Sequence, residues 1–151
     1  VQLFDLIHTV DSIDLAEELN KQAEKIGKRQ RILVQVKLSE EEAKHGVSEK
    51  ELMPLLEKIK GLQNLKLEGL MTMPPYFEDA EKARPYFKRL RDIRDEAESK
   101  GYSLPELSMG MSGDFEIAIE EGATVVRVGQ AIYGARSLPD SHFWPAASAE
   151  N

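Results

Sequence analysis

The chain alternates short apolar stretches with longer amphipathic stretches five times, and this pattern restricts its fold more than any other feature. The apolar stretches have the length and the β-branched content of buried strands. They span residues 1–7, 31–36, 65–71, 106–109 and 124–128. Parallel strands need long crossover connections, so strands that alternate with helices predict a parallel sheet with helices outside it. The chain is therefore predicted to be an α/β protein.

The predicted helices carry start and stop signals. Asp11 or Ser12 can cap the first helix, and Ser48 with Glu51 forms a capping box for the second. A long charged helix is expected over residues 79–100, where Pro85 either opens its main part or kinks it. The structured domain is expected to span residues 1–136, followed by a loosely ordered tail at 137–151 that is rich in small residues.

Composition excludes several classes of function. The 151 residues include 20 basic and 27 acidic side chains, a net charge of −7, so no broad positive field is available for a nucleic acid. No apolar run approaches the ~18 residues that a membrane span needs. The chain has no cysteine, which suits a reducing compartment, and a cytoplasmic location is expected. His8, His45 and His142 show no metal-ligand spacing, so no metal site is expected.

Two glycine-containing turns follow the last two predicted strands, where ligands gather in parallel α/β folds. The first turn, within residues 107–114, contains Gly110, Ser112 and Gly113, and the second begins after Arg127. Free amides and a hydroxyl at this position fit a phosphate. The alternative is that Ser112 only caps a helix and the glycines only serve a tight turn. Two such turns on neighbouring strands favour the phosphate interpretation.

Arg127 and His8 are the other candidate ligand contacts. Arg127 would end a buried strand, where a charge needs a partner or a ligand. We favour a ligand contact, and an ion pair with Asp114 or Glu116 stays open as the alternative. His8 lies near a strand end, where a histidine is more often a structural residue than a base.

Five motifs occur in a characteristic order. They are His8-Thr-Val-Asp11, Gln35-Val with Glu42-Ala-Lys-His-Gly46, Gly69-Leu-Met-Thr-Met-Pro74, Leu107-Ser-Met-Gly-Met-Ser112 with Asp114, and Val126-Arg-Val-Gly-Gln-Ala-Ile-Tyr-Gly-Ala-Arg136. With these motifs the chain resembles the pyridoxal 5′-phosphate homeostasis protein family from Phe4 to Arg136. The resemblance implies a TIM-like parallel βα barrel of the alanine racemase N-terminal type, in which the five strands are the last five of eight.

The resemblance also implies a cofactor, pyridoxal 5′-phosphate, and residues that hold it. Ser112 and the backbone at Gly129 and Gln130 would bind the phosphate, and Arg127 would face the pyridine nitrogen. The pocket would be lined by Met109, Gly110, Met111 and His8. The family protein buffers or delivers the cofactor and has no established turnover, so no catalytic residue is assigned.

The family's Schiff-base lysine belongs to a segment upstream of Val1, and Lys37 stands where the family usually has a polar amide. Lys37 is the one lysine expected just after a strand and could substitute in principle. An incomplete barrel would have open edges, which a second chain or self-association would cover. Two alternatives stay open: a racemase-like enzyme that uses pyridoxal phosphate, and a structural α/β module that binds a generic phosphate.

Overall fold

The computed structural model describes residues 1–39 and 45–134, and within them five parallel strands form a single sheet. The strands are β1 (Leu6–Val10), β2 (Gln30–Gln35), β3 (Leu65–Met71), β4 (Glu106–Met111) and β5 (Val125–Arg127). Their order in the sheet is the order in the chain, and every neighbouring pair is parallel. The predicted α/β class and parallel sheet are confirmed.

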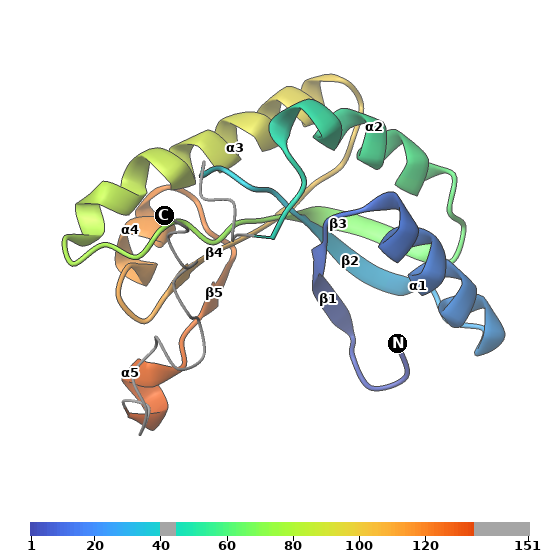
Figure 1. Cartoon of the computed structure of the whole chain (residues 1–151), viewed down its shortest axis with the longest axis horizontal. Helices are drawn as coiled ribbons and strands as arrows, with labels where there is room; N and C mark the ends of the chain where they lie inside the picture. Colours follow the sequence, from blue (N-terminus) through green and yellow to red (C-terminus); the bar gives the residue numbers. More distant parts are fainter. Residues whose placement is uncertain (40–44, 135–151) are drawn as a thin grey trace, which may run out of the picture.

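Helices follow the strands along the chain. They are α1 (Ile13–Lys25), α2 (Glu49–Lys60), the 3₁₀ turn η1 (Ala80–Ala83), α3 (Arg84–Ser99), α4 (Phe115–Glu120) and α5 (Gln130–Tyr133). The sheet is strongly arched, and α1, α2 and α3 lie along its outer side (Figure 1). The arch leaves a concave face that these helices do not cover.

Helices α1, α2 and α3 begin at the residues that the sequence marks as helix starts. Ser12, rather than Asp11, caps α1 by accepting a hydrogen bond from the Leu15 amide at 3.3 Å. The Ser48 hydroxyl accepts from the Glu51 amide and donates to the Glu51 carboxylate at 2.6 Å. Pro85 lies in the first turn of α3, so it opens this helix and does not kink it.

Side chains alternate between the two faces of each strand. On β2 and β4, Ile32, Val34, Leu107 and Met109 belong to the apolar core that α2 and α3 complete. Ser108, between Leu107 and Met109, must therefore point to the concave face. The alternation thus places Ser108 and the apolar Leu33 on the concave face, and the neighbouring apolar residues under the helices.

The first strand starts later than its composition suggests. Residues 1–7 were expected to form it, but the paired strand runs from Leu6 to Val10, because its ladder to β2 begins where Leu6 meets Arg31. His8 consequently lies inside β1 and not after it. The fourth strand likewise extends to Met111, beyond the expected end at residue 109.

Strands β3 and β4 approach each other very closely at Gly69. A Cβ atom at this position would lie 1.9 Å from the carbonyl oxygen of Glu106, its partner across the ladder. The β2–β3 register also shifts beside it, between Ile32 and Leu33. Only glycine fits this approach.

A charge network joins the start of α3 to the end of α4. Arg84 contacts Glu81, Glu120 and Glu121, and Arg91 also contacts Glu121, at distances from 2.7 to 3.0 Å. The Glu121 side chain is only 9% exposed, so its charge is paired twice where water is largely excluded. The network anchors α4, which directly follows the first glycine turn.

No helix within residues 1–39 and 45–134 is both long and apolar enough to span a membrane. The predicted tail at 137–151 lies outside the described residues, so its expected loose order and the domain end at residue 136 stay predictions.

Candidate cofactor site

Ser108 is the centre of a polar cluster on the concave face, in the middle of β4. The residue is completely buried. Its hydroxyl lies 2.9 Å from Nδ1 of His8 and accepts a hydrogen bond from Arg127 at 2.5 Å. Arg127 also donates to the carbonyl oxygen of Thr72 at 3.1 Å. Residues of β1, β4, β5 and the segment after β3 thus meet at one point.

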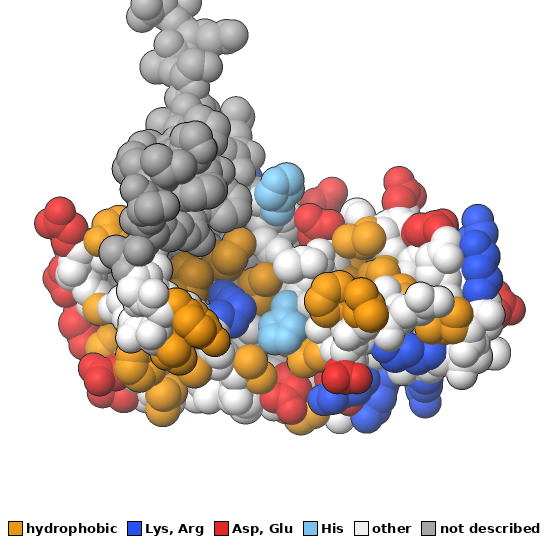
Figure 2. Space-filling view, turned by 90° about the horizontal axis from the view of Figure 1, so that it is seen from below, with side chains coloured by type: hydrophobic (Ala, Val, Ile, Leu, Met, Phe, Trp, Pro, Cys, Tyr) orange, Lys and Arg blue, Asp and Glu red, His pale blue; other side chains and the backbone are white. Residues whose placement is uncertain are grey.

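The arch of the sheet makes this meeting possible. His8 lies on β1 and Ser108 on β4, with β2 and β3 between them. In a flat sheet, three strand spacings of about 4.8 Å would hold these two strands too far apart for a direct contact. Figure 2 views the molecule from below and shows a histidine beside a basic side chain, with apolar side chains around them.

Arg127 is held by neutral partners in the described part of the chain. Burial lowers its pKa, and the charge of Asp114 opposes this effect from a distance. Its hydrogen bonds go to a hydroxyl and a carbonyl, so the alternative of an ion pair with Asp114 or Glu116 gains no support from them. Asp114 instead accepts a hydrogen bond from the Met111 amide at 2.6 Å. Among the described residues, no carboxylate contacts the guanidinium.

Burial also lowers the pKa of His8, and the nearby charge of Arg127 lowers it further, while Glu106 raises it. Both main causes disfavour a protonated imidazole. His8 therefore contributes a neutral ring beside the cationic Arg127.

Ser112 connects the two glycine turns. Its hydroxyl oxygen accepts hydrogen bonds from the amides of Gly129 and Ala131, each at 3.2 Å. It does not cap α4, whose first turn has no side-chain cap. The helix-cap alternative is therefore wrong for α4, and the predicted proximity of the two turns is confirmed. Two backbone N–H groups converge on one oxygen, as they would on an oxygen of an anion.

The glycines of the two turns differ in whether the surrounding atoms leave room for a side chain. A Cβ at Gly113 or Gly129 would meet nothing within 4 Å, so packing does not demand glycine there. Gly110 has a φ of +92°, and a Cβ there would lie 2.6 Å from Cβ of Ala118. Packing of α4 against β4 accounts for Gly110. Open space beside Gly129 allows a ligand to approach its backbone.

The structure places Met109 away from the cluster. Its side chain is fully buried in the core beneath the helices, on the face of β4 opposite to Ser108. The side chain of Met109 therefore does not line the pocket, because strand alternation turns it toward the helices. Met111 is 38% exposed and lies in the first turn, next to Ser112. Gln130 is exposed and begins α5.

Lys37 follows β2 at the same end of the sheet. Its amide donates to the Val47 carbonyl at 2.9 Å, and Gly46 packs against its backbone. The loop after β2 thus returns to the strand end, where Val36 and Val47 form a parallel bridge. The side chain of Lys37 is half-buried.

Ser108 and Thr72 are site residues that the sequence did not single out for this role. Thr72 is fully buried, and its hydroxyl donates to the Val36 carbonyl at 2.9 Å. The available signal was a small polar residue, Ser108, between two apolar residues of a buried strand.

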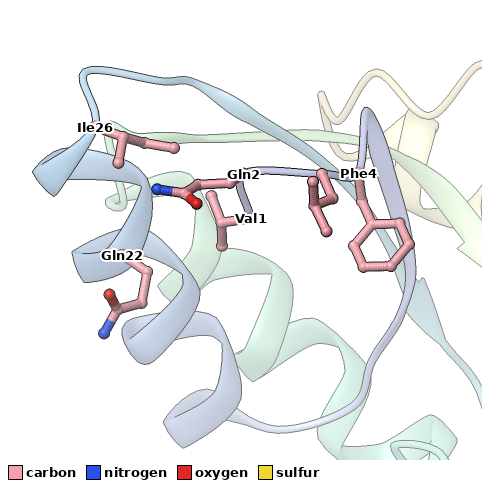
Figure 3. Close-up of a pocket in the computed structure, with 6 residues that line it drawn as sticks. Val1, Gln2, Phe4, Gln22 and Ile26 are labelled. Atoms are coloured by element: carbon pink, nitrogen blue, oxygen red, sulfur yellow. The ribbon is translucent and has the colours of Figure 1, made fainter.

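Two open hollows lie at the other end of the sheet. One of about 350 Å³ opens where Val1, Gln2 and Phe4 lie beside Gln22 of α1 and Ile26 at its end (Figure 3). The other, of about 500 Å³, is lined by residues that include Lys66 and Tyr102, near the starts of β3 and β4. Neither includes the cluster around Ser108. Within the described ranges no group of three or more potential metal ligands occurs.

Comparison with known proteins shows which family the chain belongs to. The family model described as alanine racemase, N-terminal domain, matches residues 1–137. The chain belongs to this family. The pyridoxal phosphate homeostasis protein of Aquifex aeolicus is 49% identical over 132 residues, which are 87% of this chain and 58% of that protein. The human protein of the same name is 38% identical over 139 residues, 87% of this chain and 50% of its own length.

Solved structures agree with this membership. PipY from Synechococcus elongatus PCC7942, solved with PLP bound, matches with a TM-score of 0.82 at 36% identity, over 89% of this chain and 63% of PipY. Alanine racemase from Clostridium difficile 630 matches with a TM-score of 0.68 at 19% identity, over 87% of this chain and 36% of that enzyme, and shows the fold alone. The expected alanine racemase N-terminal type of fold is confirmed, and the chain spans about half to two thirds of the length of these homeostasis proteins and of PipY.

In this alanine racemase N-terminal domain, we predict that Arg127 serves a ligand more than the fold. Arg127→Gln removes two hydrogen bonds, each worth ~1 kcal/mol, but also removes a buried charge that costs free energy. The thermal midpoint should therefore change by only a few degrees, whereas the affinity for a ligand such as the PLP that PipY holds should change clearly. A collapsed midpoint with normal binding of that ligand would instead assign Arg127 to the fold.

Proposed function

We propose that the chain forms the C-terminal part of a pyridoxal 5′-phosphate-binding barrel that carries the cofactor for homeostasis or delivery, without established turnover of its own. The observation that carries this proposal is the junction of the two glycine turns beside Arg127. There, the Ser112 hydroxyl and two backbone amides lie together next to the buried guanidinium of Arg127. The similar homeostasis proteins and the PLP-bound PipY structure support this reading.

The residues present fit the phosphate of this cofactor. Ser112 can donate its hydroxyl proton, and the amides of Gly129 and Ala131 converge on its oxygen, on either side of the Gln130 amide. Gly129 leaves open space where an oxygen would approach its backbone. Backbone amides and hydroxyls are the usual ligands of a phosphate in such barrels.

Arg127 suits the ring end of the same cofactor. When bound, pyridoxal phosphate supplies an aldehyde and an electron-accepting pyridine ring. A guanidinium facing the pyridine nitrogen disfavours its protonation, because two positive charges would meet. The ring then accepts electrons less readily, which favours storage over reactions at an amino acid's α-carbon.

We further propose that the five strands are the last five of an eight-stranded barrel. Five of eight βα units are about 63% of a barrel, which equals the share of PipY that the chain matches. The outer edges of β1 and β5 would then pair with the remaining strands. A second chain or self-association could cover the same edges. The cytoplasmic location stays a prediction.

Ser112→Ala tests the proposed phosphate site. One charge-assisted hydrogen bond contributes roughly 1.5–3 kcal/mol, so the substitution should weaken pyridoxal phosphate binding by about ten-fold to a hundred-fold. The measurement is a titration followed by visible absorbance, in a protein that includes the upstream segment of the family. Ser99→Ala removes an exposed hydroxyl at the end of α3 and is the matched control. Equal affinity of the Ser112→Ala variant and this control would remove Ser112 from the site.

A further inference from the structure

The hydroxyl of Ser108 has one proton and must satisfy two neighbours. Arg127 can only donate, so the contact at 2.5 Å uses a lone pair of the Ser108 oxygen. The hydroxyl proton then remains available for Nδ1 of His8, at 2.9 Å. This arrangement satisfies all three groups.

The opposite assignment leaves a buried group without a partner. If Nδ1 of His8 carried a proton, it would donate to the Ser108 oxygen, which already accepts from Arg127. The Ser108 hydroxyl proton would then need another acceptor, and the hydrogen bonds within the described ranges give it none. An unpaired hydroxyl in a completely buried residue costs about 1–3 kcal/mol.

We propose that Ser108 is a positioning residue that keeps His8 neutral, with its proton on Nε2, and orients the guanidinium of Arg127. The basic nitrogen of His8 is then turned toward Ser108 and is engaged there. His8 can offer a site ligand an N–H donor, but it cannot serve as a general base without breaking this bond. Arg127 and His8 together form a site with two donors, which selects a ligand atom that accepts hydrogen bonds.

The charged groups around the imidazole favour the same state. Arg127 on β5 opposes a second positive charge, while Glu106 on β4 favours it more weakly. The ligand part of this inference rests on the proposed function, since it deepens the distinction between a carrier and a catalyst. The assignment of the proton does not depend on any ligand.

Nitrogen-15 NMR of histidine-labelled protein tests the assignment directly. The 151-residue chain is measured without ligand as a function of pH, and His8→Gln identifies the His8 signals among those of three histidines. We expect Nδ1 of His8 to be unprotonated and Nε2 protonated in the neutral ring. Ser108→Ala should mix the two neutral forms and move the titration midpoint of His8 up toward the ordinary value of 6.5. Ser99→Ala should leave both readouts unchanged.

A neutral His8 with its proton mainly on Nδ1 would overturn the proposal. So would a Ser108→Ala variant with unchanged tautomer and titration midpoint, provided that its thermal midpoint confirms a folded chain. Ser108→Cys keeps the volume with a weaker donor, and it should give values between those of the wild type and Ser108→Ala. If the chain shows the expected tautomer but the extended protein binds no pyridoxal phosphate, the proposed function fails and the proton assignment stands.

Discussion

Gly69→Ala is expected to destabilise the chain by about 3 kcal/mol or more, a large part of the 5–15 kcal/mol that holds an ordinary domain together. The new Cβ would lie 1.9 Å from the Glu106 carbonyl oxygen, which is a backbone atom in the ladder between β3 and β4. This clash is relieved only if β3 and β4 move apart. Thermal unfolding followed by circular dichroism should show a midpoint lower by roughly 10 °C.

Gly113→Ala is the matched control for this substitution. A Cβ at Gly113 meets nothing within 4 Å, and the residue lies in the turn after β4 and not in a ladder. Its midpoint should stay within a few degrees of the wild type. If the two alanine variants unfold at the same temperature, the close approach of β3 and β4 at Gly69 is not as described.

Covalent trapping should give an all-or-none difference between the 151-residue chain and a version that includes the family's upstream segment. Attachment of the cofactor needs an unprotonated amine fixed beside the aldehyde, usually a lysine whose pKa is lowered by its pocket. The family resemblance implies that this lysine belongs to an upstream segment. Lys37 instead begins a loop after β2, with its backbone held by Val47. Borohydride treatment with pyridoxal phosphate should therefore yield no stoichiometric adduct in the shorter chain and one adduct in the longer one.

Peptide mapping by mass spectrometry locates any adduct, and Lys37→Arg in the longer protein is the control. This variant should trap the cofactor as the unsubstituted protein does. One equivalent trapped at Lys37 in the shorter chain would contradict both the role of the upstream lysine and the proposal that depends on it.

The order of strands and helices could be predicted from local sequence patterns, because the face that each element buries is visible in the spacing of its own apolar residues. The strand at Leu65–Met71 matches its prediction at both ends, since it is a mainly apolar stretch with turn signals on each side. Ser48 and Pro85 mark helix starts through contacts within one turn, which sequence spacing reveals. The start of β1 was wrong because pairing with β2, and not composition, determines where that strand begins.

The cluster around Ser108 could not be predicted with the same success. His8 and Ser108 lie 100 positions apart in the chain and on strands that are not neighbours, so their contact depends on the curvature of the sheet. Sequence motifs pointed to Arg127, but not to the roles of Ser108 and Thr72, which hold its guanidinium. A motif also says which residues occur together and not to which side of a strand each one points, as the core-facing side chain of Met109 illustrates.

The sheet has the same order as the chain, and this has a consequence for how the structure can form. Each strand needs only the unit immediately before or after it, so pairing can spread along the polypeptide without waiting for distant segments to meet. The hydrogen bond between His8 and Ser108, which joins β1 to β4 across the arch, can form only when these strands are already curved. Assembly of the proposed donor groups is therefore expected to be a late event that reports on completed curvature, whereas the ladder beneath them forms by local steps.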